Sequence, residues 1–506
     1  PIYEPKMSKF FKDPTNTALL LSDQLPGPRM AWEFFFAINE IPRGSGNTPA
    51  VQIRIAEVAK EVGLEVSVDP ASNCLLIVKP ADAGFEDVPG VCFQGHSDMV
   101  NQKNSDCEHD FLKDAIKGRI DDGWLKACGT SLGADNAIGL AGALVVMTDK
   151  TLKTGKIELL VTVDEETGMD GVMDLSPGFF ASKLVVNADS EDDGVITIGC
   201  SGGGDAIFTH EPATSGPVEG GTLVSVALTG GYGGHSGCDI HLGRGNAGKI
   251  MTRIVGPAIK LGGRVVSFKA GNVYNAIARE ATAEVVIPTE HLETFQKRAA
   301  QHFQDAKIQF KKTDKYELAI ETKTAAGEVA LAHEESKKLV DILLTLPHGV
   351  MRMSPVIEGL VETSNNLAII DVAAGKWLIG CSTRSSDMSQ LRAVQLKLKA
   401  VADLAGVACK LEKPYSGWMP NKDSPLLKLT QGIMKELLGR EPVVEAIHAG
   451  LECGMLMEKY EGLDCISIGP TLKNPHCPDE MLKLDTVVPF FDICKRLVTD
   501  IAAGKL

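Results

Sequence analysis

Short apolar runs alternate with longer amphipathic stretches over the first two hundred residues of the chain. Helices are expected within residues 29–63, on both sides of a turn at Ile41–Gly44, and at Ala137–Met147, where apolar side chains recur at helical spacing. Strands are expected at Cys74–Val78, Val91–Phe93, Ile157–Val163, Leu184–Ala188 and Val195–Ile198. Strands that alternate with helices predict an α/β domain with a mostly parallel mixed sheet flanked by helices.

The pattern changes after Ser201–Gly204, a glycine-rich stretch that we expect to be a flexible joint. Strands are then expected at Leu223–Leu228, Arg264–Lys269, Ala281–Ile287 and Val407–Leu411, and helices at Asn246–Lys260, His291–Gln304 and Met388–Ala405. This order predicts an α+β lid domain over residues 206–412, inserted between the two parts of the first domain, residues 1–205 and 413–506. A strand at Asp464–Ile468 returns the chain to the first domain.

Composition and charge argue against several classes of protein. Of 506 residues, 44% are hydrophobic, which is enough for a full core, and the net charge of -15 argues against nucleic-acid and anionic-membrane partners. No stretch is long and apolar enough to cross a bilayer. The 12 cysteines are scattered without a Cys-x-x-Cys pair, which is typical of a reducing compartment and predicts a cytoplasmic location.

Histidine and carboxylate side chains follow several of the expected strands. His96-Ser97-Asp98 comes directly after the strand that begins at Val91. Two residues apart on an extended segment, His96 and Asp98 point to the same side, so Asp98 can fix the tautomer of a metal-binding imidazole. Taken alone, the motif is better explained as a polar turn after a strand.

Four more carboxylates lie at comparable positions. Asp135 precedes a helix and is also well placed to cap it. Glu165 and Glu166 follow the strand at Ile157–Val163, and Asp189 follows the next strand. Adjacent carboxylates beside a buried strand are costly unless a positive charge is near, although an exposed turn is the alternative.

His476 lies in a proline-containing loop after the last expected strand. A lone loop histidine is commonly solvated, and only its combination with the carboxylates and with His96 changes that interpretation. Together these side chains supply enough oxygen and imidazole ligands for two divalent metals, with one group left over as a base. The combination predicts hydrolysis at a paired-metal site.

Two side chains of the expected lid have chemistry that suits a substrate. His235 lies in Gly233-Gly234-His235-Ser236-Gly237, where flanking glycines allow close approach to another surface. Arg384 ends an apolar run and is suited to bind a carboxylate through two hydrogen bonds. The alternatives are an incidental turn histidine and a surface charge.

The chain resembles the aminoacylhistidine dipeptidases (Xaa-His dipeptidases, peptidase D), which belong to the co-catalytic zinc superfamily of aminoacylases and carboxypeptidases. The resemblance covers nearly the whole chain from Trp32 past His476. It rests on the motifs Gly95–Val100, Thr130–Asn136, Glu165–Gly171, Gly234–Gly237, His448–Gly454 and Ser467–Thr471. The turn Arg43-Gly44-Ser45-Gly46 and Cys477 depart from the family pattern.

The resemblance implies a role for each of these side chains. One metal is expected on His96, Asp135 and Asp189, and the other on Asp135, Glu166 and His476. Glu165 is the expected general base, and Asp98 is the expected orienting carboxylate. His235 is expected to stabilise the oxyanion, and Arg384, His448 and Glu452 are expected to bind the substrate.

The expected activity is hydrolysis of unblocked dipeptides, with histidine at the C-terminal position. The expected cofactors are two divalent ions, zinc in the first place, with manganese or cobalt as alternatives. A small dipeptide is the expected partner, and the oligomeric state is open, with a homodimer as one outcome. Two alternatives remain: an amidohydrolase or carboxypeptidase acting on N-acyl amino acids, and a catalytically silent peptide-binding homologue.

Overall fold

The computed structural model describes residues 10, 12–217, 220–325, 327–373, 375–412 and 414–506. The chain forms two compact units. The first unit comprises Pro1–Gly199, Asn421–Ala446 and Met455–Leu506, and the second comprises Cys200–Pro420 and Ile447–Gly454. The short segment Ile447–Gly454 therefore groups with the second unit. The domain boundaries expected at 205/206 and 412/413 stay predictions, and residue 413 lies outside the described residues.

The first unit is built on an eight-stranded mixed sheet. Its strands, in spatial order, are β1 (Glu65–Val68), β2 (Leu75–Lys79), β6 (Ile157–Thr162), β3 (Val91–His96), β7 (Leu184–Asn187), β21 (Asp464–Ser467), β8 (Val195–Cys200) and β20 (Val443–Ile447). The central strands β6, β3, β7 and β21 pair in parallel, whereas β1, β2 and β8 join antiparallel. The predicted α/β class is confirmed, with the parallel pairing concentrated at the centre.

The helices that accompany this sheet are α1 (Pro14–Leu20), α2 (Arg29–Asn39), α3 (Pro49–Glu61), α4 (Ala134–Thr148), α5 (Asp170–Asp174), α10 (Pro425–Leu438), α11 (Glu452–Lys459) and α12 (Leu484–Ala502). Helix α3 contacts β1 and β2, and α10 contacts β21. Helix α4 contacts β3, β6, α2 and α12, and it is buried along almost its whole length. A separate four-stranded sheet contains β22 (Leu472–Lys473), β23 (Met481–Lys483), β5 (Trp124–Ala127) and β4 (Gly118–Asp121).

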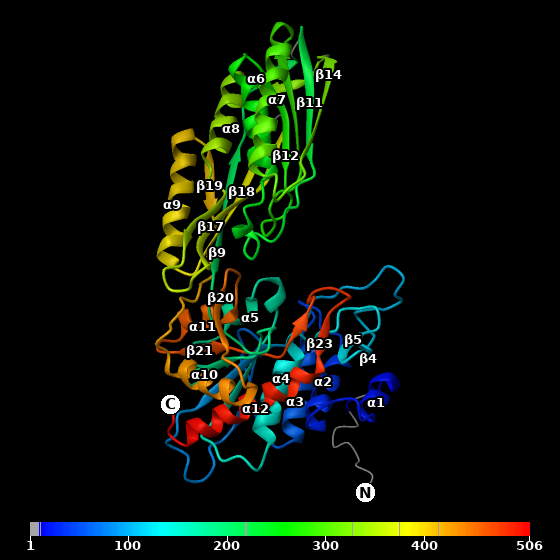
Figure 1. Ribbon diagram of the computed structural model, residues 1–506, viewed down its shortest axis with the longest axis vertical. Helices are drawn as coiled ribbons and strands as arrows, with labels where there is room; N and C mark the ends of the chain where they lie inside the picture. Colours follow the sequence, from blue (N-terminus) through cyan, green and yellow to red (C-terminus); the bar gives the residue numbers. More distant parts are fainter. Residues whose placement is uncertain (1–9, 11, 218–219, 326, 374, 413) are drawn as a thin grey trace. The chain divides into compact units, whose positions relative to one another are not determined.

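The second unit contains a nine-stranded sheet in which every pairing between neighbouring strands is antiparallel. Its strands are β14 (Glu317–Thr324), β11 (Gly221–Thr229), β13 (Ala281–Pro288), β12 (Arg264–Ala270), β17 (Val361–Ala373), β18 (Lys376–Ser385), β9 (Gly202–His210) and β19 (Ala408–Leu411), with β16 (Gly349–Met353) beside β17. The helices α6 (Ala247–Lys260), α7 (Leu292–Gln309), α8 (His333–Thr345) and α9 (Met388–Ala405) enclose one hydrophobic cluster with it (Figure 1). β10 (Thr214–Pro217) pairs with β15 (Val329–Leu331) in a separate ribbon.

The prediction that Ser201–Gly204 is a flexible joint is wrong. Gly202–Gly204 begin β9 and pair in register with the end of β18. They are glycines because the chain near Tyr415 crosses them closely: a Cβ on Gly203 would lie 2.5 Å from the ring of Tyr415. The absence of side chains therefore reflects close packing, and not freedom of the backbone.

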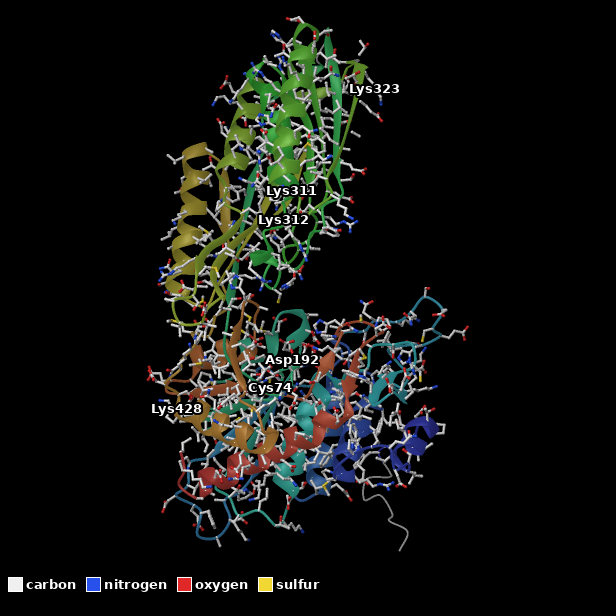
Figure 2. All side chains as sticks on the ribbon, viewed as in Figure 1. Cys74, Asp192, Lys311, Lys312, Lys323 and Lys428 are labelled. Carbon is white, nitrogen blue, oxygen red and sulfur yellow. The ribbon has the colours of Figure 1, made fainter. Side chains whose placement is uncertain are left out.

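The edge strand β14 is largely exposed and carries charged side chains, among them Lys323, which Figure 2 labels together with Lys311 and Lys312. Charges on an edge strand disfavour pairing with the edge of another sheet. The rim of the second unit is therefore protected against uncontrolled strand addition.

All twelve cysteines lie within the described residues, and none forms a disulfide bond. No helix among the described residues has the length and apolar character that a bilayer crossing requires. The scattered cysteine spacing thus corresponds to a fold held together without disulfides.

Candidate metal centre

The parallel centre of the first sheet brings distant segments of the chain to one edge. His96 is the last residue of β3, Glu166 lies in a 3-10 turn (Glu165–Thr167) just after β6, and Asp189 follows β7. Strands that run in the same direction end at the same edge, which is where open α/β sheets place their sites. The apolar strands therefore position the polar residues that follow them.

Asp135 lies at the centre of the cluster, at the start of α4. Its Oδ1 atom is 2.9 Å from Nε2 of His96, and its Oδ2 atom is 3.2 Å from Nε2 of His476. Asp189 Oδ1 lies 3.3 Å from the same nitrogen of His96, and Glu166 Oε2 lies 2.8 Å from Nε2 of His476. The structure brings together all five side chains that the sequence proposes as metal ligands.

The five side chains form two overlapping groups. His96, Asp135 and Asp189 make one, and Asp135, Glu166 and His476 make the other. One ligand atom each from His96, Asp135 and Glu166 lie within 4.8 Å of one another, close enough to hold a single metal ion. The two carboxylate oxygens of Asp135 face different histidines, which is the arrangement that a bridging ligand needs.

The electrostatics of the cluster favour a cation. Burial lowers the pKa of His96, but the carboxylates of Asp189 and Asp135 outweigh it and leave this pKa well above its usual value. Hydrogen bonds to Asp135 and Glu166 raise the pKa of His476 to about 11. Burial raises the pKa of Asp189 to about 6. The shifts of the two histidines indicate that positive charge is stabilised among the carboxylates.

The donor atoms themselves test whether a metal fits. Among the described residues, Glu166 Oε1 is a buried carboxylate oxygen of the cluster that accepts no hydrogen bond. Buried oxygen atoms without a partner are costly in free energy. Three carboxylates and two imidazoles are also donors that divalent metal ions accept. The residues therefore fit a metal ion.

Asp98 lies behind His96 and is fully buried. Nδ1 of His96 is 3.2 Å from the carbonyl oxygen and 3.4 Å from Oδ1 of Asp98. Both atoms are acceptors, so Nδ1 carries a proton, and Nε2 is the nitrogen that faces the cluster and would bind a metal. Burial raises the pKa of Asp98, but the hydrogen bond and charge of His96, together with hydrogen bonds from Ser45 and Glu165, outweigh it and lower this pKa to about 2.

The same carboxylate also orders the turn that carries the two adjacent glutamates. The backbone N–H groups of Glu165 and Glu166 donate to Asp98 Oδ1 and Oδ2 over 3.1 and 3.3 Å. Ser45, from the turn that departs from the family pattern, donates to Oδ2 over 2.8 Å. Asp98 therefore links the turn after β6 to His96, which the spacing of His96 and Asp98 alone does not reveal.

Strained backbone also marks this edge of the sheet. Asp164 and His476 have left-handed backbone conformations, with φ of 56° and 61°. Such conformations are uncommon for residues other than glycine and concentrate at functional sites. Asp164 is held by a 2.6 Å hydrogen bond from the backbone N–H of Gly46.

Sequence reasoning missed Glu191, two residues after Asp189. Burial, followed by the carboxylates of Asp135 and Asp189, raises the pKa of Glu191 to about 8. The only sequence signal for Glu191 is its position in the motif Asp189-Ser190-Glu191. An acidic residue so near another one is more typical of a solvated loop. The raised pKa of Glu191 reflects the negative charge of the neighbouring carboxylates in addition to burial.

His235 belongs to the second unit and has a defined tautomer. The backbone N–H groups of Gly237 and Cys238 donate to its Nδ1 over 3.3 and 3.0 Å. Burial and Arg384 lower the pKa of His235. A neutral ring whose Nδ1 accepts hydrogen bonds carries its proton on Nε2. His235 therefore presents an N–H donor.

Arg384 and His448 lie beside His235 in the same unit. A Cβ on Gly237 would lie 3.1 Å from the His235 ring, 3.3 Å from Nε of Arg384 and 2.2 Å from the carbonyl oxygen of His448. Arg384 is 9% exposed and its Nη1 donates to the hydroxyl of Tyr415 over 3.1 Å. Three of the four expected residues of the second unit are thus gathered around one glycine.

Burial, followed by Arg384, lowers the pKa of His448 to about 3, and its Nε2 contacts Ser364 Oγ at 2.7 Å. Glu452 is buried at the start of α11, and its role in substrate binding stays a prediction. Tyr415 and Ser364 escaped sequence reasoning because no motif marks a tyrosine or a serine whose partner is far along the chain.

Comparison with known proteins places these observations among relatives. The model of peptidase family M20/M25/M40 matches residues 92–500. The chain is 36% identical over 477 residues to the cytosol non-specific dipeptidase of Escherichia coli (strain K12), an alignment that covers 94% of this chain and 98% of the relative.

Solved structures give the same picture. The crystal structure of aminoacylhistidine dipeptidase from Vibrio alginolyticus matches with a TM-score of 0.86 and 38% identity, over 95% of this chain and 98% of that one. The aminopeptidase PepT from Bacillus cereus matches with a TM-score of 0.53 and 14% identity, over 95% of this chain and all of that one, and shares the fold alone.

Proposed function

The chain belongs to peptidase family M20/M25/M40, and we propose that it is a metal-dependent dipeptidase that hydrolyses unblocked dipeptides, among them those with C-terminal histidine. The relatives that support this substrate class are named as a non-specific dipeptidase and an aminoacylhistidine dipeptidase. The resemblance inferred from the sequence motifs is confirmed by the family match and by both relatives.

The observation that carries the proposal is that the other four ligand side chains are gathered around Asp135. Our assignment gives His96, Asp135 and Asp189 to one divalent ion and Asp135, Glu166 and His476 to the other, with zinc as the metal. Bound ions of this kind polarise a carbonyl oxygen and lower the pKa of a water molecule. Asp98 holds the Nδ1 proton of His96, so Nε2 is the nitrogen that would bind the first ion.

The proton transfers fall to Glu165. Its carboxylate takes a proton from the attacking water and later gives it to the leaving amine, as a general base and then a general acid. The backbone N–H of Glu165 is bonded to Asp98, so the turn that presents this carboxylate is fixed relative to His96. Glu166, the next residue, faces His476 instead.

The groups of the second unit bind the substrate in this proposal. The Nε2 proton of His235 donates to the oxygen that becomes negative as the peptide carbon turns tetrahedral. Arg384 binds the C-terminal carboxylate of the dipeptide, and His448 and Glu452 contribute to the same substrate site. A buried guanidinium that recognises a free carboxylate favours substrates with a free C-terminus.

A substrate panel tests this proposal. The purified full chain is assayed on Ala-His, β-Ala-His, Ala-Ala, N-acetyl-histidine and a tripeptide. We expect hydrolysis of the dipeptides and little or none of the other two. Preferential hydrolysis of N-acetyl-histidine would show an N-acyl amino acid hydrolase, and the absence of any turnover in the presence of zinc, manganese or cobalt would show a silent homologue.

We also propose a cytoplasmic location. The Escherichia coli relative is named as a cytosolic enzyme, and none of the twelve cysteines of this chain forms a disulfide bond. Cysteines in this number without disulfide bonds are typical of a reducing compartment.

A further inference from the structure

A buried carboxylate holds the loop that carries Asp135. Glu480 is 2% exposed, and it accepts four backbone hydrogen bonds. The N–H groups of Leu132 and Gly133 donate to Oε2 over 2.7 and 2.9 Å, and those of Ala134 and Asp135 donate to Oε1 over 2.8 and 3.3 Å. Each carboxylate oxygen thus accepts hydrogen bonds from two N–H groups. Only a side chain whose two terminal atoms are both acceptors can do this.

Arg43 binds a backbone carbonyl group of the same loop, whereas Glu480 binds its N–H groups. This guanidinium, 1% exposed, donates from Nη2 to the carbonyl oxygen of Gly133. From Nη1 it donates to the carbonyl oxygens of Ser97 and Asp98 over 2.9 and 2.8 Å. Arg43 therefore ties the loop to the end of β3, and Glu480 ties it to the segment of His476.

The position of this loop decides where the carboxylate of Asp135 lies. Asp135 must face both His96 and His476, and its neighbours Glu166 and Asp189 are also acidic. Like charges repel, so without other restraints the acidic segments would separate when no cation is bound. Ordering them at the moment of binding would reduce the affinity for the ion.

We propose that Glu480 is a positioning residue for the metal centre: it fixes the Leu132–Asp135 loop so that Asp135 stands between the two histidines before a metal binds. The inference rests on the proposed function, because it takes the five-residue cluster to be a metal site. Glu480 itself contacts no ligand side chain; it acts through the backbone that leads to Asp135.

Substitution of the carboxylate by its amide tests the proposal. Glu480→Gln has the same size, but it offers one acceptor oxygen, and its NH₂ group meets N–H groups instead of acceptors. Zn²⁺ affinity is measured by calorimetric titration of the chelator-treated full chain. We expect affinity for the more weakly held ion to fall about 10- to 100-fold, the scale for residues that orient a ligand.

Glu158→Gln is the matched control. Glu158 is also 2% exposed, and it accepts hydrogen bonds from the backbone N–H groups of Ala181 and Ser182. The distance from Ser182 N to Oε2 of Glu158 is 2.7 Å. It lies near the amino end of β6, away from the strand ends that carry the ligands. The same chemical change there should leave Zn²⁺ affinity at the wild-type value.

A measurement on the wild-type protein keeps the proposal open to refutation if Glu480→Gln does not fold. Amide hydrogen exchange of the metal-free full chain should show the N–H groups of Leu132–Asp135 protected, because Glu480 binds them without metal. Rapid exchange of these four amides in folded, metal-free protein would overturn the proposal.

The outcomes separate this inference from the proposed function. If the wild-type chain binds no Zn²⁺, the metal centre itself is refuted. If the wild type binds Zn²⁺ and Glu480→Gln binds it equally well, only the role of Glu480 is refuted. Equal weakening in Glu158→Gln and Glu480→Gln would show a general loss of stability, which also overturns the inference.

Discussion

Nε2 of His476 lies 3.2 Å from Oδ2 of Asp135, although 341 positions separate the two residues in the chain. The contact exists because β21 pairs in parallel with β7 and so returns the last part of the chain to the ligand edge of the sheet. A second metal position therefore depends on the C-terminal segment. The site is complete only when the chain has crossed the whole second unit and returned.

Glu165 and Glu166 should respond differently to the same substitution. Glu165→Gln should keep both ions and lose about 10²–10⁴ in kcat, the scale for a general base. Glu166→Gln should bind one ion much more weakly, because a neutral amide is a poorer ligand for a dication. Metal content and kcat of both variants check the assignment, and the reverse pattern would show that the base is misidentified.

Removal of His235 should slow turnover without releasing metal. Its Nε2 proton is the expected oxyanion donor, so His235→Ala should lower kcat about 10²–10³-fold. His241→Ala, which removes an exposed histidine of the same loop region, serves as the control and should keep wild-type kcat. Steady-state kinetics and metal analysis are carried out on both variants. A normal kcat in His235→Ala would show that His235 serves only the structure of its turn.

The hydroxyl of Tyr415 should matter for binding more than for turnover. It accepts a 3.1 Å hydrogen bond from Arg384, the expected carboxylate receptor. Tyr415→Phe should raise KM about tenfold, the scale of one lost hydrogen bond to a charged group, while kcat stays within about twofold. Tyr232→Phe, at an exposed tyrosine, is the control. A fall in kcat at unchanged KM would contradict this role.

His448 should make the folded protein sensitive to mild acid. Burial holds its pKa at about 3, against about 6.5 in an unfolded chain. Below pH 6.5 the unfolded chain binds a proton that the folded chain does not, so stability falls with pH until about pH 3; at pH 5 the loss is about 2 kcal/mol. His448→Gln removes this contribution.

Thermal unfolding at pH 7 and pH 5 measures the effect. The drop in Tm between the two should be smaller for His448→Gln than for the wild-type chain. Equal drops would show that His448 is protonated in the folded protein, against the lowered pKa.

Much of the fold could be predicted because the strands of the first sheet are short apolar runs. The runs near Val91, Ile157 and Leu184 correspond to β3, β6 and β7, and the acidic motifs after them mark the ligand edge. Parallel pairing then places His96, Glu166 and Asp189 together without further information.

Other features could not be predicted because their meaning depends on distant partners. The glycines of Ser201–Gly204 suggest a linker until Tyr415 is seen to cross them. Glu480 looks like a loop acid, yet it binds backbone groups 345 to 348 positions earlier. Hydrophobic periodicity carries no signal for a polar contact of that range.

The most direct test of the account is a metal titration followed by activity. The full chain is stripped with a chelator, dialysed, and assayed on Ala-His while Zn²⁺ is added in steps of half an equivalent. We expect no hydrolysis by the stripped protein and a return of activity that reaches its plateau close to two equivalents per chain. Full activity of the metal-free protein would contradict the account.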